Sequence, residues 1–417
     1  MSKILLLSNQ NRYLEHDLYC RLGCENKSRF HELIYVDAEL EKILPSTTSK
    51  VLDIEEKAVV FDSIEKIDPP ILENQSIRGV LGKIFRRFRN ILKLYSWKLK
   101  FLSKINSLKP DAIIVVSALS VTTRLVLKCY GKAPVFYIQP AVVRYRPQSS
   151  IGYMNSFVSA LVPKSIFFPR SSKRTTFFEG SEFKRLYSLM WSKTWFEDVG
   201  PNARPRFYEV GFPTVEDGIL KNHCHSIPIK RVLIVLNKRN KMSGKSWMKY
   251  WHFYNDLINV FPNLHFQFKK HPIDPLGDLK ITKLEFIEEV EWEYVDLVIC
   301  HWSTILRESV AFGIPTILVN PEGKFDRRLE ECYLLSYPYI AKNISDVKDY
   351  IEEFQLEPKR WKNFRRDFIK KDFSKYASES SKRIFDIIKE KVSESGNLVS
   401  SKGILFDDCR ELKDSRS

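Results

Sequence analysis

The sequence lacks any apolar run that approaches the roughly 20 residues needed to cross a bilayer. The apolar stretch at residues 4–7 is too short for a signal peptide and is predicted to be a first core strand. The seven cysteines are scattered, and the close pair Cys20 and Cys24 has neither a second pair nor the histidine spacing of a zinc site. We therefore expect reduced thiols, no metal site and a cytoplasmic protein.

Two common nucleotide motifs are also missing. The chain has no Gly-x-Gly-x-x-Gly and no P-loop, so no motif supports a dinucleotide oxidoreductase or a P-loop kinase. A chain of 417 residues is longer than one that folds around a single hydrophobic core, which predicts two domains. Its content of 44% hydrophobic residues predicts a globular protein. The formal charge of +16 indicates anionic partners: nucleic acid, an anionic membrane surface or phosphorylated substrates.

Apolar runs alternate with helical patterns along the whole chain, which predicts an α/β fold with parallel sheets. Helices are predicted at residues 13–22, 83–109 and 120–130, and at several places within 344–391. Strands are predicted at residues 3–8, 33–36, 58–61, 111–117, 134–139, 231–236, 264–269, 295–300 and 316–319.

Residues 295–320 have the pattern of a buried strand, a polar turn, a short helix and a second buried strand. Ser303 and Thr304 stand where the helix begins, so their hydroxyls and the free backbone N–H groups face a ligand above the strand ends. An anionic ligand fits this place. Glu308, about one turn later, can accept hydrogen bonds from a sugar hydroxyl. The alternative is an ordinary βαβ unit in which Ser303 only caps the helix.

Basic side chains follow two other strands of the same half. Lys238 and Arg239 come after the strand at 231–236 and suit a phosphate, although a solvated basic loop is the alternative. Lys270, His271 and Pro272 end the strand that begins at residue 264. There an imidazole can donate a hydrogen bond to a leaving phosphate, and the lysines reinforce it.

The spacing Ser303-x4-Glu308-x4-Gly313-x-Pro315 resembles the donor-binding unit in the C-terminal domain of GT-B glycosyltransferases that build bacterial capsules and lipopolysaccharides. The Lys-His-Pro tip resembles the His-Pro motif of bacterial sialyltransferases and the loops of Kdo transferases. The strand that ends at Gln139 resembles one that ends in Gln-His-Gly in related enzymes, but here Pro140 follows.

The resemblance implies two Rossmann-like domains with an interdomain cleft that holds a nucleotide-sugar donor. It implies that His271, Ser303 and Thr304 hold the donor phosphate and that Glu308 holds the ribose. We include His301, Lys238, Arg239, Lys270 and Pro272 among the donor-binding candidates. Neither a metal nor a cofactor is implied, and the absence of a clear Asp-x-Asp tip agrees.

The segment around Gly211 and Pro213 resembles the crossing between GT-B domains. We therefore predict an N-terminal acceptor domain at 1–212, a C-terminal donor domain with terminal helices at 213–391, and a disordered polar tail at 392–417. Glu216-Asp217-Gly218 matches the letters of the acidic motif of bacterial sialyltransferases, but its position at the crossing favours coincidence.

Residues 83–109 contain nine Lys or Arg residues and no acid. An amphipathic helix is predicted there, and two interpretations stay open. Either the helix lies on an anionic membrane with Arg86, Arg87, Arg89 and Lys93 facing the lipid, or it packs on the core with a solvated basic face. No motif supports nucleic acid as a partner. The predicted apolar face consists of Ile84, Phe88, Ile91, Leu92, Tyr95, Leu99 and Leu102.

The function predicted from these features is glycosyl transfer from a nucleotide-sugar to a growing bacterial surface glycan, with a lipid-linked or oligosaccharide acceptor at the inner membrane face. A general base is required for an inverting transfer. His16 and Asp17, in the first predicted helix, are the candidates, unless they only cover its first turn. The alternatives are a nucleotide-sugar 2-epimerase, for which His301 and Glu322 would supply part of the site, and a non-enzymatic basic binding protein.

Overall fold

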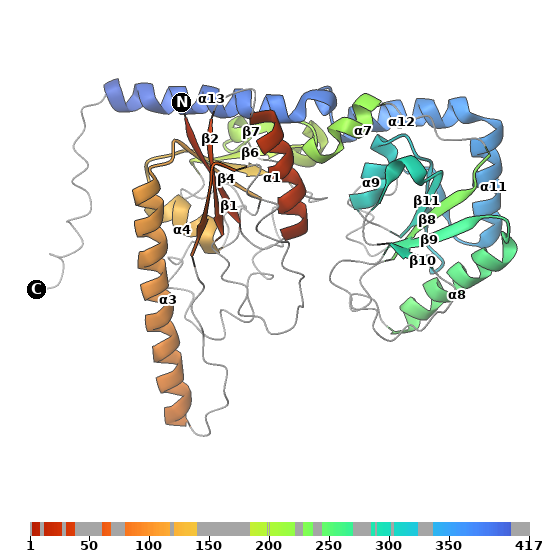
Figure 1. Ribbon diagram of the computed structural model, residues 1–417, viewed down its shortest axis with the longest axis horizontal. Coiled ribbons are helices and arrows are strands. Elements are labelled where there is room, and N and C mark those ends of the chain that lie inside the picture. The colour runs from red at the N-terminus through yellow and green to blue at the C-terminus, as the bar shows by residue number, and fades with distance from the viewer. Residues whose placement is uncertain are drawn as a thin grey trace, which may run out of the picture.

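The protein is described from a computed structural model covering residues 2–8, 12–26, 31–37, 61–67, 80–116, 121–139, 184–197, 199, 201–221, 228–236, 244–269, 285–287, 290–301, 304–323 and 337–401. The elements form two α/β domains, each built on a parallel sheet (Figure 1). The predicted fold class is therefore confirmed.

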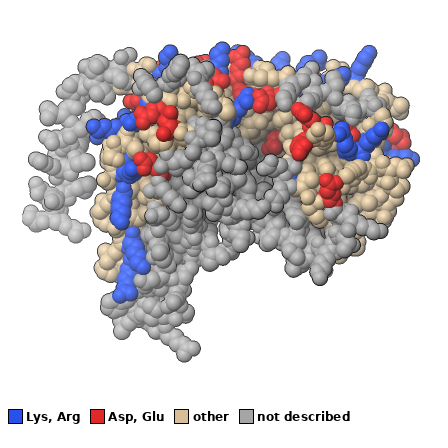
Figure 2. Space-filling view, viewed as in Figure 1, with Lys and Arg blue, Asp and Glu red and all other residues tan. Residues whose placement is uncertain are grey.

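The first domain contains a seven-stranded sheet in the order β3-β2-β1-β4-β5-β6-β7, with all neighbours parallel. Its helices include α1 (Arg12–Asn26), α3 (Val80–Leu108) and α4 (Val121–Cys129). Lys and Arg side chains form a row along α3 (Figure 2). The strands are β1 (Lys3–Ser8), β2 (Glu32–Asp37), β3 (Ser63–Lys66), β4 (Ala112–Val115), β5 (Val135–Ile138), β6 (Leu186–Met190) and β7 (Phe207–Glu209).

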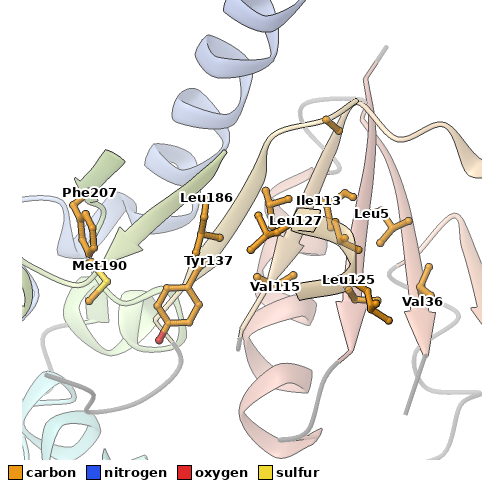
Figure 3. Close-up of a cluster of buried hydrophobic side chains, with 14 of the residues drawn as sticks. Leu5, Val36, Ile113, Val115, Leu125, Leu127, Tyr137, Leu186, Met190 and Phe207 are labelled. Atoms are coloured by element: carbon orange, nitrogen blue, oxygen red, sulfur yellow. The ribbon is translucent and has the colours of Figure 1, made fainter. Parts of the chain in front are cut away.

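Both faces of this sheet are buried, because side chains alternate along each strand between two apolar layers. Leu5 and Leu7 of β1 join the layer that α3 and α4 cover, part of which is drawn in Figure 3. Ile4 and Leu6 point into the opposite layer, which contains residues of α1 and of the C-terminal helix. The uninterrupted apolar runs of β1, β4 and β5 follow from this double burial.

The second domain contains a six-stranded parallel sheet in the order β10-β9-β8-β11-β12-β13. Asp296 fixes the start of its central pair, since its carboxylate accepts hydrogen bonds from the backbone N–H groups of Lys230 and Arg231. The strands are β8 (Arg231–Val235), β9 (His265–Lys269), β10 (Glu285–Ile287), β11 (Leu297–Cys300), β12 (Thr316–Val319) and β13 (Ile340–Ala341). The helices are α8 (Gly244–Val260), α9 (Thr304–Ala311), α11 (Ile344–Leu356) and α12 (Pro358–Asp372).

The chain passes between the domains twice. It crosses first after Gly211, through a short turn at Pro213–Val215 and α7 (Glu216–Lys221). It returns after α12 through α13 (Ser380–Ser401), which lies across the first domain in Figure 1. Ile384, Phe385, Ile387 and Ile388 of α13 are buried against the first sheet.

Two predicted boundaries need correction. Residues 380–391, assigned to the C-terminal domain, pack on the N-terminal sheet because their apolar side chains complete its outer layer. The polar tail predicted from residue 392 is helical as far as Ser401, since α13 continues past its buried part. Residues 402–417 lie outside the described part of the chain.

Some predicted strands also differ from the structure. Strand β3 at Ser63–Lys66 was not predicted. Of the strand predicted at 58–61, residues 58–60 lie outside the described residues. Strands β6, β7, β10 and β13 were not predicted. In the part of the chain that the structure describes, no helix combines the length and the apolar character needed to cross a membrane.

Candidate functional site

Each sheet reverses its strand order beside its first strand, at β1/β4 in the first domain and at β8/β11 in the second. In open α/β sheets ligands bind outside the carboxyl ends of the strands at such a reversal. The candidate site therefore lies at the carboxyl ends of β8, β11 and β12 in the second domain. Its side chains come from the residues that follow these strands and from α8 and α9.

His301 follows β11 directly, and the preceding Cys300 pairs with Val235 at the end of β8. Its side chain is 8% exposed, and its ring centroid lies 4.5 Å from that of Tyr250 in α8. Burial lowers the pKa of His301 to about 4. The imidazole is therefore neutral at physiological pH, with one nitrogen that donates and one that accepts a hydrogen bond.

Tyr250 and Glu322 add polar atoms beside His301. Burial raises the pKa of the Tyr250 phenol, and the negative charge of Glu322 raises it further, so the hydroxyl stays protonated. Lys249 lies 3.9 Å from Glu322, measured between Nζ and Oε1. These residues add a hydroxyl donor, the Lys249 cation and the Glu322 carboxylate to the site.

Asn320 follows β12, which pairs with β11 on the side opposite β8. Its backbone N–H donates to the carbonyl of Ala341 at 2.8 Å, which fixes the residue at the sheet edge. Its side-chain Oδ1 is buried and has no hydrogen-bond partner among the described residues. A buried acceptor of this kind suits a ligand hydroxyl or amide.

Helix α9 begins at Thr304, after the end of β11, and the N-terminus of an α-helix can bind an anion. Glu308, on the second turn, is partly buried. The adjacent Arg307 has a structural contact: its Nε donates a hydrogen bond to Oδ2 of Asp372 at 3.0 Å. The backbone of α9 therefore offers donors to an anion, with the Glu308 carboxylate about one turn away.

Of the predicted donor-site residues, the structure brings His301, Thr304 and Glu308 to one end of the second sheet. The side chain of Thr304 is not among those described. Val235 and Lys269 pair at the ends of β8 and β9, so the two predicted phosphate loops start at neighbouring points of the same edge. The residues outside the described part of the chain are Lys238, Arg239, Lys270, His271, Pro272 and Ser303.

The candidate bases His16 and Asp17 lie within α1, which begins at Arg12. Their side chains are not described, so their catalytic role stays a prediction. The side chains of Arg86 and Arg87 in α3 are not described either, so their predicted contact with a membrane stays a prediction. Arg89 is exposed and Lys93 is partly buried.

Glu216 belongs to a hydrogen-bonded junction. Its carboxylate accepts hydrogen bonds from Nε of Arg21 at 3.0 Å and from the backbone N–H of Ser381 at 2.7 Å. Asp217 accepts from the same arginine at 2.9 Å. These contacts join α1, α7 and α13, which agrees with the interpretation of Glu216-Asp217-Gly218 as a coincidental match.

Sequence reasoning missed Tyr250 and Asn320. Asn320 carried a usable signal, since it is the first polar residue after a strand buried on both faces. Tyr250 carried none, because its place depends on how α8 packs beside β11.

No protein-family model matches the chain, and no curated protein sequence matches it. Solved structures do share its fold. The UDP-GlcNAc 2-epimerase from Neisseria meningitidis bound to UDP-GlcNAc has a TM-score of 0.53 at 12% identity, covering 93% of this chain and 100% of that one. The glycotransferase of kitacinnamycin has a TM-score of 0.50 at 13% identity, covering 94% and 99%.

The wall teichoic acid polymerase TagF, in its H548A form, has a TM-score of 0.50 at 11% identity, covering 94% of this chain and 89% of that one. These similarities extend over both domains and concern the fold alone. The chain therefore has a GT-B-type fold of two Rossmann-like domains, as glycosyltransferases and nucleotide-sugar epimerases do.

Proposed function

We propose that the protein is a glycosyltransferase that moves a sugar from a nucleotide-sugar to a growing bacterial surface glycan. The observation that carries this proposal is the gathering of a neutral His301, the start of α9 and Glu308 at the strand reversal of the second sheet. Backbone donors, a neutral imidazole and a carboxylate match the phosphate and ribose of a nucleotide.

In this proposal, the N–H groups of the first turn of α9 and an N–H of His301 donate to the donor phosphate. Glu308 accepts hydrogen bonds from the ribose hydroxyls. The basic and polar residues that follow β8, β9 and β11 are further phosphate ligands: Lys238, Arg239, Lys270, His271 with Pro272, and Ser303.

The reaction joins an acceptor hydroxyl oxygen to the glycosyl carbon of the donor. The bond from that carbon to the phosphate oxygen breaks, and its electron pair leaves with the nucleotide. The N–H donors and cations stabilise this developing negative charge, so the proposed transfer needs neither a metal nor a cofactor. The proton of the acceptor hydroxyl passes to a base, for which Asp17 and His16 are the candidates.

A nucleotide-sugar 2-epimerase is the second candidate. The similarity in fold to a UDP-GlcNAc 2-epimerase favours it, and so does the carboxylate of Glu322, which acts on Tyr250, the residue that packs against His301. An epimerase acts on the nucleotide-sugar alone, whereas a transferase consumes it only when an acceptor is present.

This difference supplies the test. The purified protein is incubated with UDP-, CDP- and CMP-activated sugars, each with and without oligosaccharide and lipid-linked acceptors, and the products are followed by proton NMR. Release of free nucleotide that depends on an acceptor is expected. Isomerisation of the sugar without an acceptor would establish the epimerase instead, and no change in any nucleotide-sugar would contradict both proposals.

A further inference from the structure

Among its described side chains, 88–108, helix α3 has two apolar faces, of which one packs on the protein. Leu94, Trp97, Phe101 and Ile105 are at most 3% exposed and belong to the core of the first domain. This packing supports the second interpretation of the basic segment, a helix anchored on the core.

The opposite face of α3 carries a stripe of large apolar side chains in solvent. Phe88, Leu92, Tyr95 and Leu99 are between 49% and 58% exposed. Their spacing of four, three and four residues aligns them on one side of the helix, which makes about 3.6 residues per turn. Four members of the predicted apolar face are therefore on the surface. We call these four residues the α3 stripe.

Cations border the α3 stripe, and acids are absent from it. No Asp or Glu occurs in residues 80–108. Arg89 and Lys100 are exposed beside one edge of the stripe. Lys98 lies beside the other edge, with Nζ 5.8 Å from the centre of the Tyr95 ring. Figure 2 shows Lys and Arg side chains as a row along the helix.

We propose that the α3 stripe docks on an anionic membrane surface, with its apolar side chains among the acyl chains and its bordering cations at the lipid phosphates. A bilayer of anionic lipid matches both parts of this surface, apolar depth and negative charge. A second copy of the chain would bring two rows of like charge together. Nucleic acid would engage the cations but leave the aliphatic side chains in water.

The core-packed face of α3 makes this docking directional. Because Trp97 and Phe101 hold the helix rigidly on the first sheet, the domain would approach the membrane in one orientation. This inference stands on α3 alone and does not depend on glycosyl transfer. A failure of either proposal would therefore leave the other one standing.

The test is co-sedimentation of the full chain with vesicles. One preparation contains equal parts of phosphatidylcholine and phosphatidylglycerol, and the other contains phosphatidylcholine alone. The wild-type protein is expected to sediment with the anionic vesicles only. Raising the salt concentration is expected to release it, since exposed charges are screened.

Two leucine changes separate the stripe from general hydrophobicity. Leu92→Ser combined with Leu99→Ser is expected to weaken vesicle binding by at least about tenfold, because less apolar area is then transferred from water to the bilayer. Leu356→Ser is the matched control, since Leu356 is 81% exposed on α11 of the other domain. Its binding should equal that of the wild type. Melting curves verify that each variant is folded.

A charge variant tests the bordering cations. Lys98→Gln combined with Lys100→Gln is expected to weaken binding to the anionic vesicles by about fivefold per charge, at low salt. The proposal is overturned if the folded wild type stays in the supernatant, or if the leucine variant binds like the wild type. It is also overturned if sedimentation velocity without lipid shows a dimer that the leucine variant loses.

Discussion

His301 and Tyr250 pack ring against ring, 4.5 Å between centroids, where β11 ends in the second domain. The contact explains why a histidine at the mouth of a sheet stays uncharged. Burial in this place disfavours the imidazolium and lowers its pKa. A neutral donor is thus held beside the start of α9, where the backbone supplies the remaining N–H groups.

The first prediction concerns acid stability. The pKa of His301 falls from 6.5 in the unfolded chain to about 4 in the fold. The neutral form is therefore fully tolerated above the unfolded value, and stability is lost as pH falls from about 6.5 to about 4, where the loss reaches roughly 3 kcal/mol. His301→Gln should flatten this part of a plot of melting temperature against pH.

His252→Gln is the matched control, because His252 is an exposed histidine on α8. Its stability profile should follow that of the wild type. An unchanged slope in His301→Gln would show that the acid sensitivity comes from other groups.

The second prediction concerns the buried ion pair that connects α9 to the end of α12. The side chains of Arg307 and Asp372 are 4% and 1% exposed, and the arginine also lies over the Trp195 ring of the first domain. Arg307→Ala leaves a buried carboxylate without its cation, which costs about 3–5 kcal/mol. Urea denaturation measures this loss.

An exposed ion pair on α12 supplies the control. Arg366 and Asp367 are each 72% exposed, so Arg366→Ala should cost less than about 1 kcal/mol. Equal losses in the two variants would contradict the structural role of the buried pair.

The third prediction concerns Gly211, at the crossing between domains. Its φ is +85°, and an added Cβ would collide with the Ser380 hydroxyl and with the carbonyl of Tyr376. Gly211→Ala should therefore lower the free energy of unfolding by more than about 1 kcal/mol. Gly131→Ala, where a Cβ meets open space, should change it little or raise it slightly. A tolerated alanine at 211 would mean that the crossing has another conformation.

The fourth prediction separates structure from catalysis at Glu216. The carboxylate is 3% exposed and holds Arg21 and Ser381. Glu216→Ala should lower the melting temperature by several degrees, because an arginine and a backbone N–H lose their acceptor. Turnover per folded molecule should persist.

Asp217→Asn is the comparison, since its side chain is 56% exposed and its contribution should be small. A stable Glu216→Gln variant without activity would instead support a catalytic role for the Glu216-Asp217-Gly218 motif.

Much of the fold could be predicted from the sequence, because strands buried on both faces leave unbroken apolar runs. Strands β1, β4, β5, β8, β11 and β12 all have this signature. Strand β6 was missed because Tyr187 and Ser188 interrupt its run, and β13 because it has only two residues. Pairing with neighbouring strands decides such strands more than local pattern does.

Helix α3 shows a different limit of sequence analysis. Its periodicity predicted an amphipathic helix with one apolar face, and four residues of that face are exposed, whereas the buried stripe that contains Trp97 was not predicted. Trp97 and Phe101 turned out to be buried, while Leu92 and Leu99 are exposed. The choice depends on the shape of the sheet surface beneath the helix.

The site was predictable only where its residues are close in sequence. His301, Thr304 and Glu308 belong to one strand-turn-helix unit, and the structure keeps them together. Tyr250 joins them from α8, through a contact that no local pattern encodes, whereas Asn320 follows β12 of the same unit.

The central claim is that the carboxyl end of the second sheet binds a nucleotide, with Glu308 on the ribose. Isothermal titration calorimetry with UDP, CDP, CMP and GDP tests it on the wild type, on Glu308→Gln and on Glu352→Gln. Glu352 is an exposed carboxylate on α11 of the same domain and serves as the matched control.

At least one nucleotide should bind the wild type and the control equally. Its affinity for Glu308→Gln should be about tenfold to a hundredfold weaker, as expected for the loss of a charged hydrogen-bond acceptor. Absence of binding to the folded wild type at millimolar nucleotide, or equal affinity in all of these proteins, would contradict the account.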